Sequence, residues 1–353
     1  MELAQGADFR RPECRREVFQ RFYTFHLRNR THPGCVYFLL PYLAYALEWD
    51  LEQRLWAAYL NGNTQNPVTT YLLMLQGDRP RDYEKVLAFW QKNFKKLQWD
   101  TDRRHHKSKL HEGVASYLRM TALAGGQEAY WVEASEEGWS GMWRFARALW
   151  GFGRLSAWSY LEYVRILGQP EHAFPDADDL MLGDIAGSQS HRNGLCLVSC
   201  NDTWLWDGTL APGSVPAYTP ERLEELQAFA ASLLAEARQR NADSPDIGLL
   251  TLESALCTYK SWHKPNRRYP NVYADMLHDR IRWAEKQWGS QFDIFWEARQ
   301  RCLPGHLRLE ANPFDPGLSP EKQNFYLDHG CPVMMSRDWP CFDNPFDRRV
   351  WAA

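Results

Sequence analysis

Apolar residues recur at helical spacing along most of this chain, and that periodicity constrains its fold more than any other feature. The clearest case is the segment 219–240. There Thr219 is a suitable N-cap, Pro220 occupies the first turn, and Glu residues come early and Arg residues late. Further helices are expected at 14–30, 36–49, 50–63, 81–97, 110–123, 137–150, 157–167, 247–262 and 272–288. In the segment 50–63, Asp50 is expected to cap the helix, which is expected to end at Asn61 and Gly62.

Strand signals are few. Residues 195–208 predict a small β-hairpin around Asn201 and Asp202. From about residue 311 the chain is rich in Pro, Asp and Phe, which predicts an irregular extension. We therefore expect a mainly α fold, with one helical domain over 1–310 and an irregular Pro-rich C-terminal extension, 311–353, packed on it.

Composition excludes several classes of protein. Of the 353 residues, 44% are hydrophobic and 24% are charged, which is an ordinary globular balance. The longest apolar run, 35–47, is interrupted by Pro41 and is too short to span a bilayer, and the N-terminus has no apolar signal region. We expect a cytoplasmic protein with no membrane partner. It has eight Cys but no CxxC pair, and no Walker A, GxGxxG, HExxH or GxSxG motif, so no metal and no cofactor are expected.

Charge is unevenly placed along the chain. The net charge is −3, but residues 92–111 and 264–270 are strongly basic. Local patches matter more than the total for a surface that follows phosphates, so Lys107 and Lys109 are candidate DNA contacts. The 17 Trp side chains suit a helical core and also suit stacking on bases.

The stretch LWGFGRLSA, 149–157, joins two amphipathic helices through Gly151 and Gly153. Glycines permit positive φ, so backbone N–H groups at the following helix N-terminus can converge on an anion such as phosphate. Arg154 would add a charge-assisted contact. The alternative is a plain helix–helix turn that needs glycine for packing.

Three further segments are rich in polar side chains. In 61–74, Asn63, Gln65 and Asn66 offer paired donors and acceptors for a base edge or polar ligand, although a capped inter-helix loop would use the same residues.

In 183–196, a cluster of Ser, His, Arg and Asn beside glycines forms a candidate phosphate or leaving-group pocket, although each residue alone would be ordinary surface. Its members are Ser188, Ser190, His191, Arg192 and Asn193.

In 251–277, one helical face carries Glu253, Cys257 and Lys260. This segment predicts either a structural network or a site for a zwitterionic small substrate, with Arg on the carboxylate and Glu near the amine. The remaining candidate residues there are Arg268, Tyr269, Tyr273 and Asp275.

Together, FYTFHLRNRTHPGCVYFLLPYL, LNGNTQNPVTTYLL, GFGRLSAWSYLEYVRI, SQSHRNGLC and LESALCTYK…RRYPNVYAD resemble the α-glutamyl/putrescinyl thymine pyrophosphorylase family of phage amino acid:DNA transferases. The resemblance spans roughly residues 18–280 and implies a fold similar to helix-hairpin-helix DNA glycosylases. It implies a phage-encoded enzyme, acting in the host cytoplasm, whose partner is double-stranded DNA. A separate kinase would have phosphorylated a 5-hydroxymethyluracil base there. An amino acid or amine, with glycine favoured, would replace the (pyro)phosphate on the C5-methylene of that base. We expect the enzyme to be a monomer.

The residues suit that implied chemistry. A flipped base needs replacement stacking and edge contacts, the leaving phosphate needs cations and donors, and the incoming amine must lose a proton. Glycosylases of this class place an Asp shortly after the hairpin, and Asp176, Asp178 and Asp179 lie at that distance. We choose Asp179 as the base, with Glu162 and Glu253 as rivals.

The hairpin position that is Lys in bifunctional glycosylases is Leu155 here, which argues against lyase chemistry. A Cys257 thiolate adding to the pyrimidine ring is a further option. Two other functions remain open from the sequence: a DNA glycosylase acting on a modified thymine, and a non-catalytic DNA-binding protein. Direct displacement and elimination–addition are both compatible with the residues.

Overall fold

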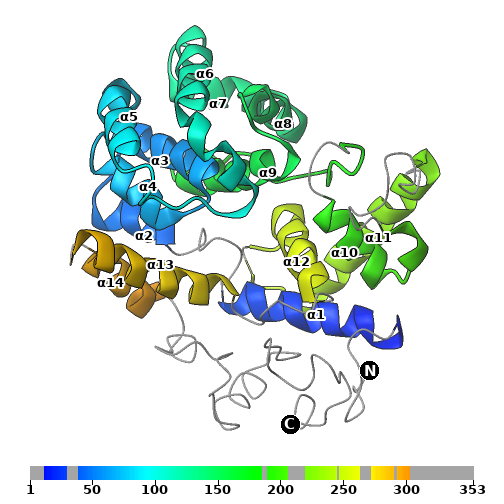
Figure 1. Cartoon of the computed structure of the whole chain (residues 1–353). Helices are drawn as coiled ribbons and strands as arrows, with labels where there is room; N and C mark the ends of the chain where they lie inside the picture. The colour runs from blue at the N-terminus through cyan, green and yellow to red at the C-terminus, as the bar shows by residue number, and fades with distance from the viewer. Residues whose placement is uncertain are drawn as a thin grey trace, which may run out of the picture. The chain divides into compact units, whose positions relative to one another are not determined.

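The computed structural model describes residues 12–29, 39–184, 189–205, 219–244, 246–262, 272–289 and 292–302. These residues form α-helices and short 3-10 helices, with no β-strand among them, so the predicted mainly α class is confirmed. Figure 1 shows the helices and their connections. No helix in the described part of the chain is long and apolar enough to cross a membrane.

The chain divides into two compact units. Unit 1 comprises residues 1–33, 179–278 and 303–353, and unit 2 comprises 34–178 and 279–302. Each unit is therefore built from segments that are distant in sequence. The predicted boundary at residue 310 lies outside the described residues and stays a prediction.

Unit 2 is a bundle in which α3 packs against α4, α7 and α9. Its centre is aromatic: the rings of Tyr59 and Tyr117 are stacked with centroids 3.8 Å apart, and Trp56 lies 5.5 Å from Tyr59. The unit contains α2 (Leu39–Ala46), α3 (Leu51–Thr64), α4 (Pro67–Met74), η2 (Pro80–Asp82), α5 (Tyr83–Lys92), η3 (Thr101–Lys109), α6 (Leu110–Leu123), α7 (Gln127–Glu136), α8 (Gly138–Ala148), α9 (Arg154–Leu167) and α14 (Asp293–Cys302).

Local sequence explains where α3 begins and ends. Asp50 caps the helix and forms a capping box with Gln53, as expected for an acidic N-cap followed by Gln at the third position. The helix was expected to end at Asn61 and Gly62 but continues to Thr64. It stops at Gln65, which adopts a left-handed conformation with φ of 50°. Asn66 then caps α4, so two helices meet across a very short turn.

Unit 1 contains α1 (Pro12–Asn29), α10 (Ser190–Val198), η4 (Asp202–Trp204), α11 (Pro220–Arg240) and α12 (Leu249–Trp262). The helix α13 (Val272–Trp288) crosses the division between the units. The expected Thr219 cap and the Pro at the first turn of α11 are confirmed. The close packing of α10 on α12 is made possible by Gly194, because a Cβ there would lie 2.4 Å from the carbonyl oxygen of Leu256.

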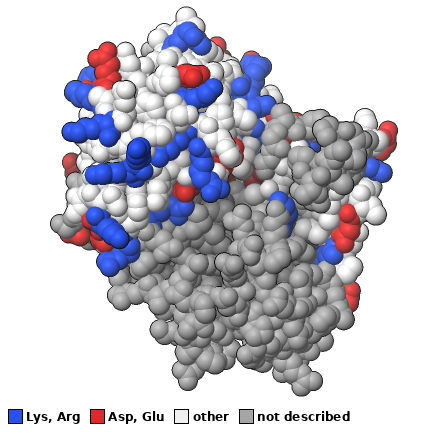
Figure 2. All heavy atoms as spheres, viewed as in Figure 1, with Lys and Arg blue, Asp and Glu red and all other residues white. Residues whose placement is uncertain are grey.

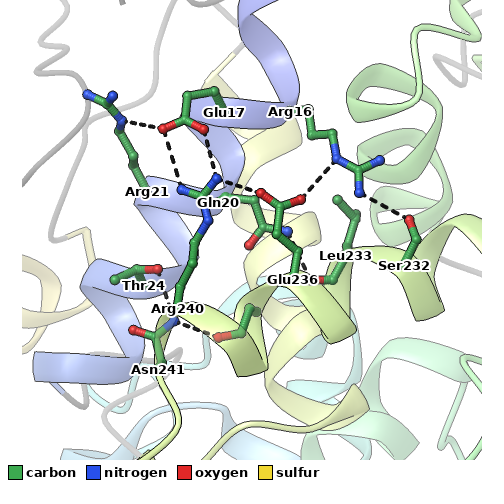
Figure 3. A network of polar contacts seen from close by, with 11 residues as sticks. Arg16, Glu17, Gln20, Arg21, Thr24, Ser232, Leu233, Glu236, Arg240 and Asn241 are labelled. Atoms are coloured by element: carbon green, nitrogen blue, oxygen red, sulfur yellow. Dashed lines mark hydrogen bonds and ion pairs between the residues drawn. The ribbon is translucent and has the colours of Figure 1, made fainter. Parts of the chain in front are cut away.

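A polar seam joins α1 to α11 in unit 1 (Figure 3). Glu17 accepts hydrogen bonds from Arg240 at 2.8 Å and from Arg21 at 2.8 Å. Arg16 donates to Glu236 at 3.0 Å. Burial alone would raise the pKa of Glu17, but the hydrogen bonds from Arg240 and Arg21 outweigh it and lower the pKa to about 2.

The β-hairpin expected at 195–208 is wrong in its described part. Residues 195–198 complete α10, and Asp202–Trp204 form the 3-10 helix η4, while 206–208 lie outside the described residues. The apolar run LCLV has no period of its own, so it fits a buried strand and a buried helix equally well. Ser190 and the residues after it begin a helix that this run continues, buried from His191 through Val198.

Candidate functional site

Two of the polar segments singled out in the sequence meet in unit 1, where α10 packs on α12. Nδ1 of His191 lies 3.8 Å from Oε1 of Glu253, and both side chains are buried, at 0% and 3% exposure. Nζ of Lys260 donates to Oγ of Ser190 at 3.3 Å. The first two residues of α10 therefore face an acid and an amine presented by a single face of α12. We call these four residues the α10–α12 cluster.

The spacing on α12 explains this arrangement. Glu253 and Lys260 are separated by seven positions, which places them on the same face two turns apart. The half-buried Cys257 lies between them on that face. Ser190 and His191 are adjacent in the chain, so one end of α10 reaches both charged groups of α12.

The other residues of the 183–196 segment are also buried. Arg192 is fully buried, and its Nη2 donates to the backbone oxygen of Asp184 at 3.4 Å. Asn193 is buried one position further along α10. Burial raises the pKa of the Cys196 thiol to about 12, so that thiol is protonated and packs as an apolar group. The guanidinium of Arg192 is thus held inside unit 1, on the same helix as Ser190 and His191.

Several candidates fall outside this cluster or outside what the structure describes. Ser188, Arg268 and Tyr269 lie outside the described residues. Tyr273 and Asp275 belong to α13, but their side chains are not among those described.

The three candidate aspartates are placed on the exposed segment after α9. Asp179 is exposed, and its Oδ1 accepts the backbone N–H of Met181 at 2.8 Å, which is the contact of a local turn. Oδ2 of Asp176 lies 3.8 Å from Nη2 of Arg165, and the Asp178 side chain is exposed. The rival Glu162 is buried in α9 of unit 2. Glu253, by contrast, lies beside His191 of the Ser-His-Arg segment.

The amide-rich segment of unit 2 forms the turn between α3 and α4. Asn66 accepts the backbone N–H of Thr69 at 2.9 Å and donates to Asp100 at 3.0 Å. Oδ1 of Asn61 accepts from Thr70 at 3.0 Å. Asn66 therefore caps α4 and ties the turn to Asp100, as expected for a capped loop between two helices. Nδ2 of Asn61 and Nε2 of Gln65 are buried without a hydrogen-bond partner among the described residues.

Arg103 is a residue that the sequence analysis missed. It is buried, its Nη2 donates to Oδ1 of Asn63 at 2.9 Å, and its Nη1 donates to the backbone oxygen of Gly151 at 2.5 Å. Its guanidinium also lies 4.9 Å from the Phe152 ring centre. Burial lowers the pKa of Arg103. Arg103 thus links the α3–α4 turn to the α8–α9 turn, and no sequence pattern distinguishes it from the exposed Arg104 beside it.

Of the two glycines in the α8–α9 turn, Gly151 has positive φ and Gly153 does not. Gly151 has φ of 76°, and a Cβ there would lie 3.2 Å from Nδ1 of His106, whereas a Cβ on Gly153 would meet nothing within 4 Å. Arg154, expected to contact phosphate, is instead fully buried with its guanidinium 4.9 Å from the Trp158 ring centre. Lys109 is exposed.

Lys107 is half-buried, and its ammonium is turned inward, donating to the backbone oxygen of Leu97 at 2.6 Å. In the described part of the chain, no three His, Cys, Asp or Glu side chains come together as a group that could hold a metal ion.

Comparison with known proteins places this chain in a family. The model of the amino acid:DNA transferase family matches residues 23–268. A protein named Serinyltransferase from Salmonella phage ViI is 26% identical over 296 residues, which covers 80% of this chain and 72% of that relative. No solved structure matches. The family match spans α10, α12 and the turns of unit 2, and it covers well over half of the sequence. The chain belongs to the amino acid:DNA transferase family.

Proposed function

We propose that this enzyme transfers an amino acid, through its amine, to the C5-methylene of phosphorylated 5-hydroxymethyluracil in double-stranded phage DNA. In this reaction the methylene carbon–oxygen bond breaks and a carbon–nitrogen bond forms. The (pyro)phosphate leaves with the bonding electrons, and the amine gives up a proton. Family membership supports the transfer of an amino acid to DNA. The particular base and leaving group rest on the motifs quoted from the sequence.

The observation that carries this proposal is the α10–α12 cluster. The reaction needs a proton acceptor for the amine and cations or donors for two anions, the leaving phosphate and the amino acid carboxylate. The buried Glu253, 3.8 Å from His191, supports the role of proton acceptor. Lys260, hydrogen-bonded to Ser190, supports the role of carboxylate contact. Arg192 is a buried cation on the same helix as Ser190 and His191, which supports the role of phosphate contact.

Two features of the proposal concern DNA. The target base would be flipped out of the duplex, because the C5-methylene must reach a protein pocket. The α8–α9 turn, with Gly151 at positive φ and Gly153 open to space, would act as the helix-hairpin-helix element that receives the backbone. Arg154 is buried with its guanidinium 4.9 Å from the Trp158 ring centre, so in this proposal it would support α9 and would not contact phosphate. Asp179 remains a candidate base, because its Oδ1 accepts the Met181 N–H and a carboxylate has further lone pairs that can accept a proton.

The donor can be either of two small amino acids in this proposal. Glycine is favoured from the sequence, while the name of the phage ViI relative refers to serine. Both have the ammonium and carboxylate that Glu253 and Lys260 would receive. The experiment below therefore offers them separately.

The test incubates the full chain with duplex DNA containing 5-phosphomethyluracil and either glycine or serine, followed by mass analysis of the released nucleosides. A new nucleoside that carries the amino acid on the C5-methylene is the expected product. Abasic sites in place of that product would indicate a glycosylase. DNA that is bound but chemically unchanged would indicate a non-catalytic binding protein.

A further inference from the structure

The basic stretch of unit 2, which includes residues 92–111, is not used by the chemistry proposed above. Residues 89–111 contain seven Lys or Arg against two Asp. Both acids are engaged: Asp100 pairs with Arg280 and accepts from Asn66, and Asp102 accepts from Thr101. The segment therefore carries a strong positive excess that its own acids do not neutralise.

Inward contacts hold η3 against α5 and the residues that follow α5. Nζ of Lys107, in η3, donates to the backbone oxygen of Leu97 and lies 4.6 Å from the Phe94 ring centre. Nε1 of Trp90, in α5, donates to the backbone oxygen of Lys107 at 3.1 Å. The Lys107 side chain thus points inward and stabilises the packing of η3 in this stretch.

The remaining Lys and Arg side chains of the stretch, apart from the buried Arg103, are exposed. Their exposed cationic members are Lys92, Lys95, Lys96, Arg104 and Lys109, with His105 among them. Figure 2 shows Lys and Arg side chains gathered over the part of unit 2 that contains α5. We call these six residues the α5–η3 surface.

This surface is joined to the α8–α9 turn within unit 2. Arg103 donates to the backbone oxygen of Gly151, His106 packs edge-on to Trp150 with ring centres 5.9 Å apart, and Nζ of Lys109 lies 5.5 Å from the Trp150 ring centre. Cationic side chains of η3 therefore lie next to the α8–α9 turn. A row of exposed cations on a rigid support matches the regular negative charge of a nucleic acid backbone.

We propose that the α5–η3 surface binds the phosphate backbone of duplex DNA beside the target base and supplies most of the sequence-independent affinity. This inference rests on the proposed function, because it takes DNA as the substrate. It assigns the outward cations Lys95, Lys96, Arg104 and Lys109 to phosphates. It assigns Lys107 to support of the surface.

The test compares two full-length variants of equal charge change. The first replaces Lys95, Lys96, Arg104 and Lys109 by Gln. The second, a control, replaces Arg81, Lys85, Arg119 and Arg144 by Gln; these are also exposed cations of unit 2. Helicity and thermal melting check that both variants fold. Affinity for a short duplex is then measured by fluorescence anisotropy across about 50–200 mM salt.

Each phosphate contact contributes about −0.9 to the slope of log K against log salt, so loss of four contacts should make the slope shallower by about 3–4 units. The control should keep the wild-type slope. Equal slopes for the two variants would overturn this inference.

The amino acid transfer assay on the wild-type chain is run in parallel. Absence of transfer there would refute the proposed function, while a shallower slope in the first variant alone would still support DNA binding by this surface. Transfer by the wild type with equal slopes in both variants would refute only the surface.

Discussion

Nδ1 of His191 lies 3.8 Å from Oε1 of Glu253, although the two residues come from different helices, α10 and α12. Both side chains are buried. A carboxylate beside an imidazole in a buried setting can hold a proton taken from a reacting amine.

Replacing Glu253 by Gln should lower kcat for amino acid transfer by about 10²–10⁴-fold, because the amide keeps the shape but cannot accept the proton. Rates are measured by nucleoside mass analysis at saturating DNA and amino acid. Thr258→Ala, which changes a half-buried side chain of the same helix, is the control and should stay within a factor of a few. Full activity of Glu253→Gln would remove Glu253 from the chemistry and return Asp179 to consideration.

Replacing Lys260 by Met should raise KM for the amino acid by about 10–100-fold while changing KM for DNA little, because a charge-assisted contact to the carboxylate is lost. The comparison donor is an amine without a carboxylate, for which the same variant should show no increase in KM. Lys85→Met, an exposed residue of unit 2, is the control. An equal increase for both donors would show that Lys260 does not recognise the carboxylate.

Replacing Arg103 by Gln should lower the free energy of unfolding by about 2–4 kcal/mol, because the buried oxygens of Asn63 and Gly151 lose their donor. Urea denaturation measures the effect. Arg104→Gln changes the exposed neighbour and should shift stability by no more than about 0.5 kcal/mol. Similar stabilities of the two variants would contradict the linking role of Arg103.

The two glycines of the α8–α9 turn should respond differently to Ala. Gly151→Ala should cost about 1–2 kcal/mol, because φ is 76° and the new Cβ would crowd His106. Gly153→Ala should leave stability nearly unchanged, since φ is −75° and the space is open. If the Gly153 backbone approaches a phosphate, that variant should still weaken DNA binding. Unchanged affinity would argue against the close approach.

The Glu17 seam predicts how stability depends on pH. The folded-state pKa of about 2 lies below the ordinary value of 4.5, so the stabilisation is fully present above about pH 4.5 and is lost as pH falls toward 2. Glu17→Gln should lower stability at pH 7 by about 1–2 kcal/mol, after allowance for solvent around Arg21 and Arg240. The same substitution should also make the free energy of unfolding depend less on pH between pH 4.5 and 2. The exposed Glu225→Gln is the control, and a matching loss in both would contradict the role of the seam.

Much of the helical framework could be predicted because its signals are local. The Thr219 and Asp50 caps lie where the sequence placed them, and the 110–123 helix has the predicted bounds. The prediction of a strand at 195–198 was wrong for a local reason as well, since a run of four apolar residues has no period that distinguishes a strand from a helix. The α3 helix extends past Gly62 to Thr64, and a Cβ at Gly62 would lie 3.1–3.2 Å from Tyr160 and Phe152.

The sequence by itself determined the family and the kinds of chemistry available, because motifs and residue types are read directly from the order of residues. It named both segments of the α10–α12 cluster. It could not determine that Ser190 meets Lys260 while His191 meets Glu253, because those pairings depend on how closely Gly194 lets α10 approach Leu256. Nor could it separate the inward Arg103, Lys107 and Arg154 from outward cations. A side chain of that type turns inward only where packing supplies carbonyl oxygens or aromatic faces, and the tertiary structure alone decides where those lie.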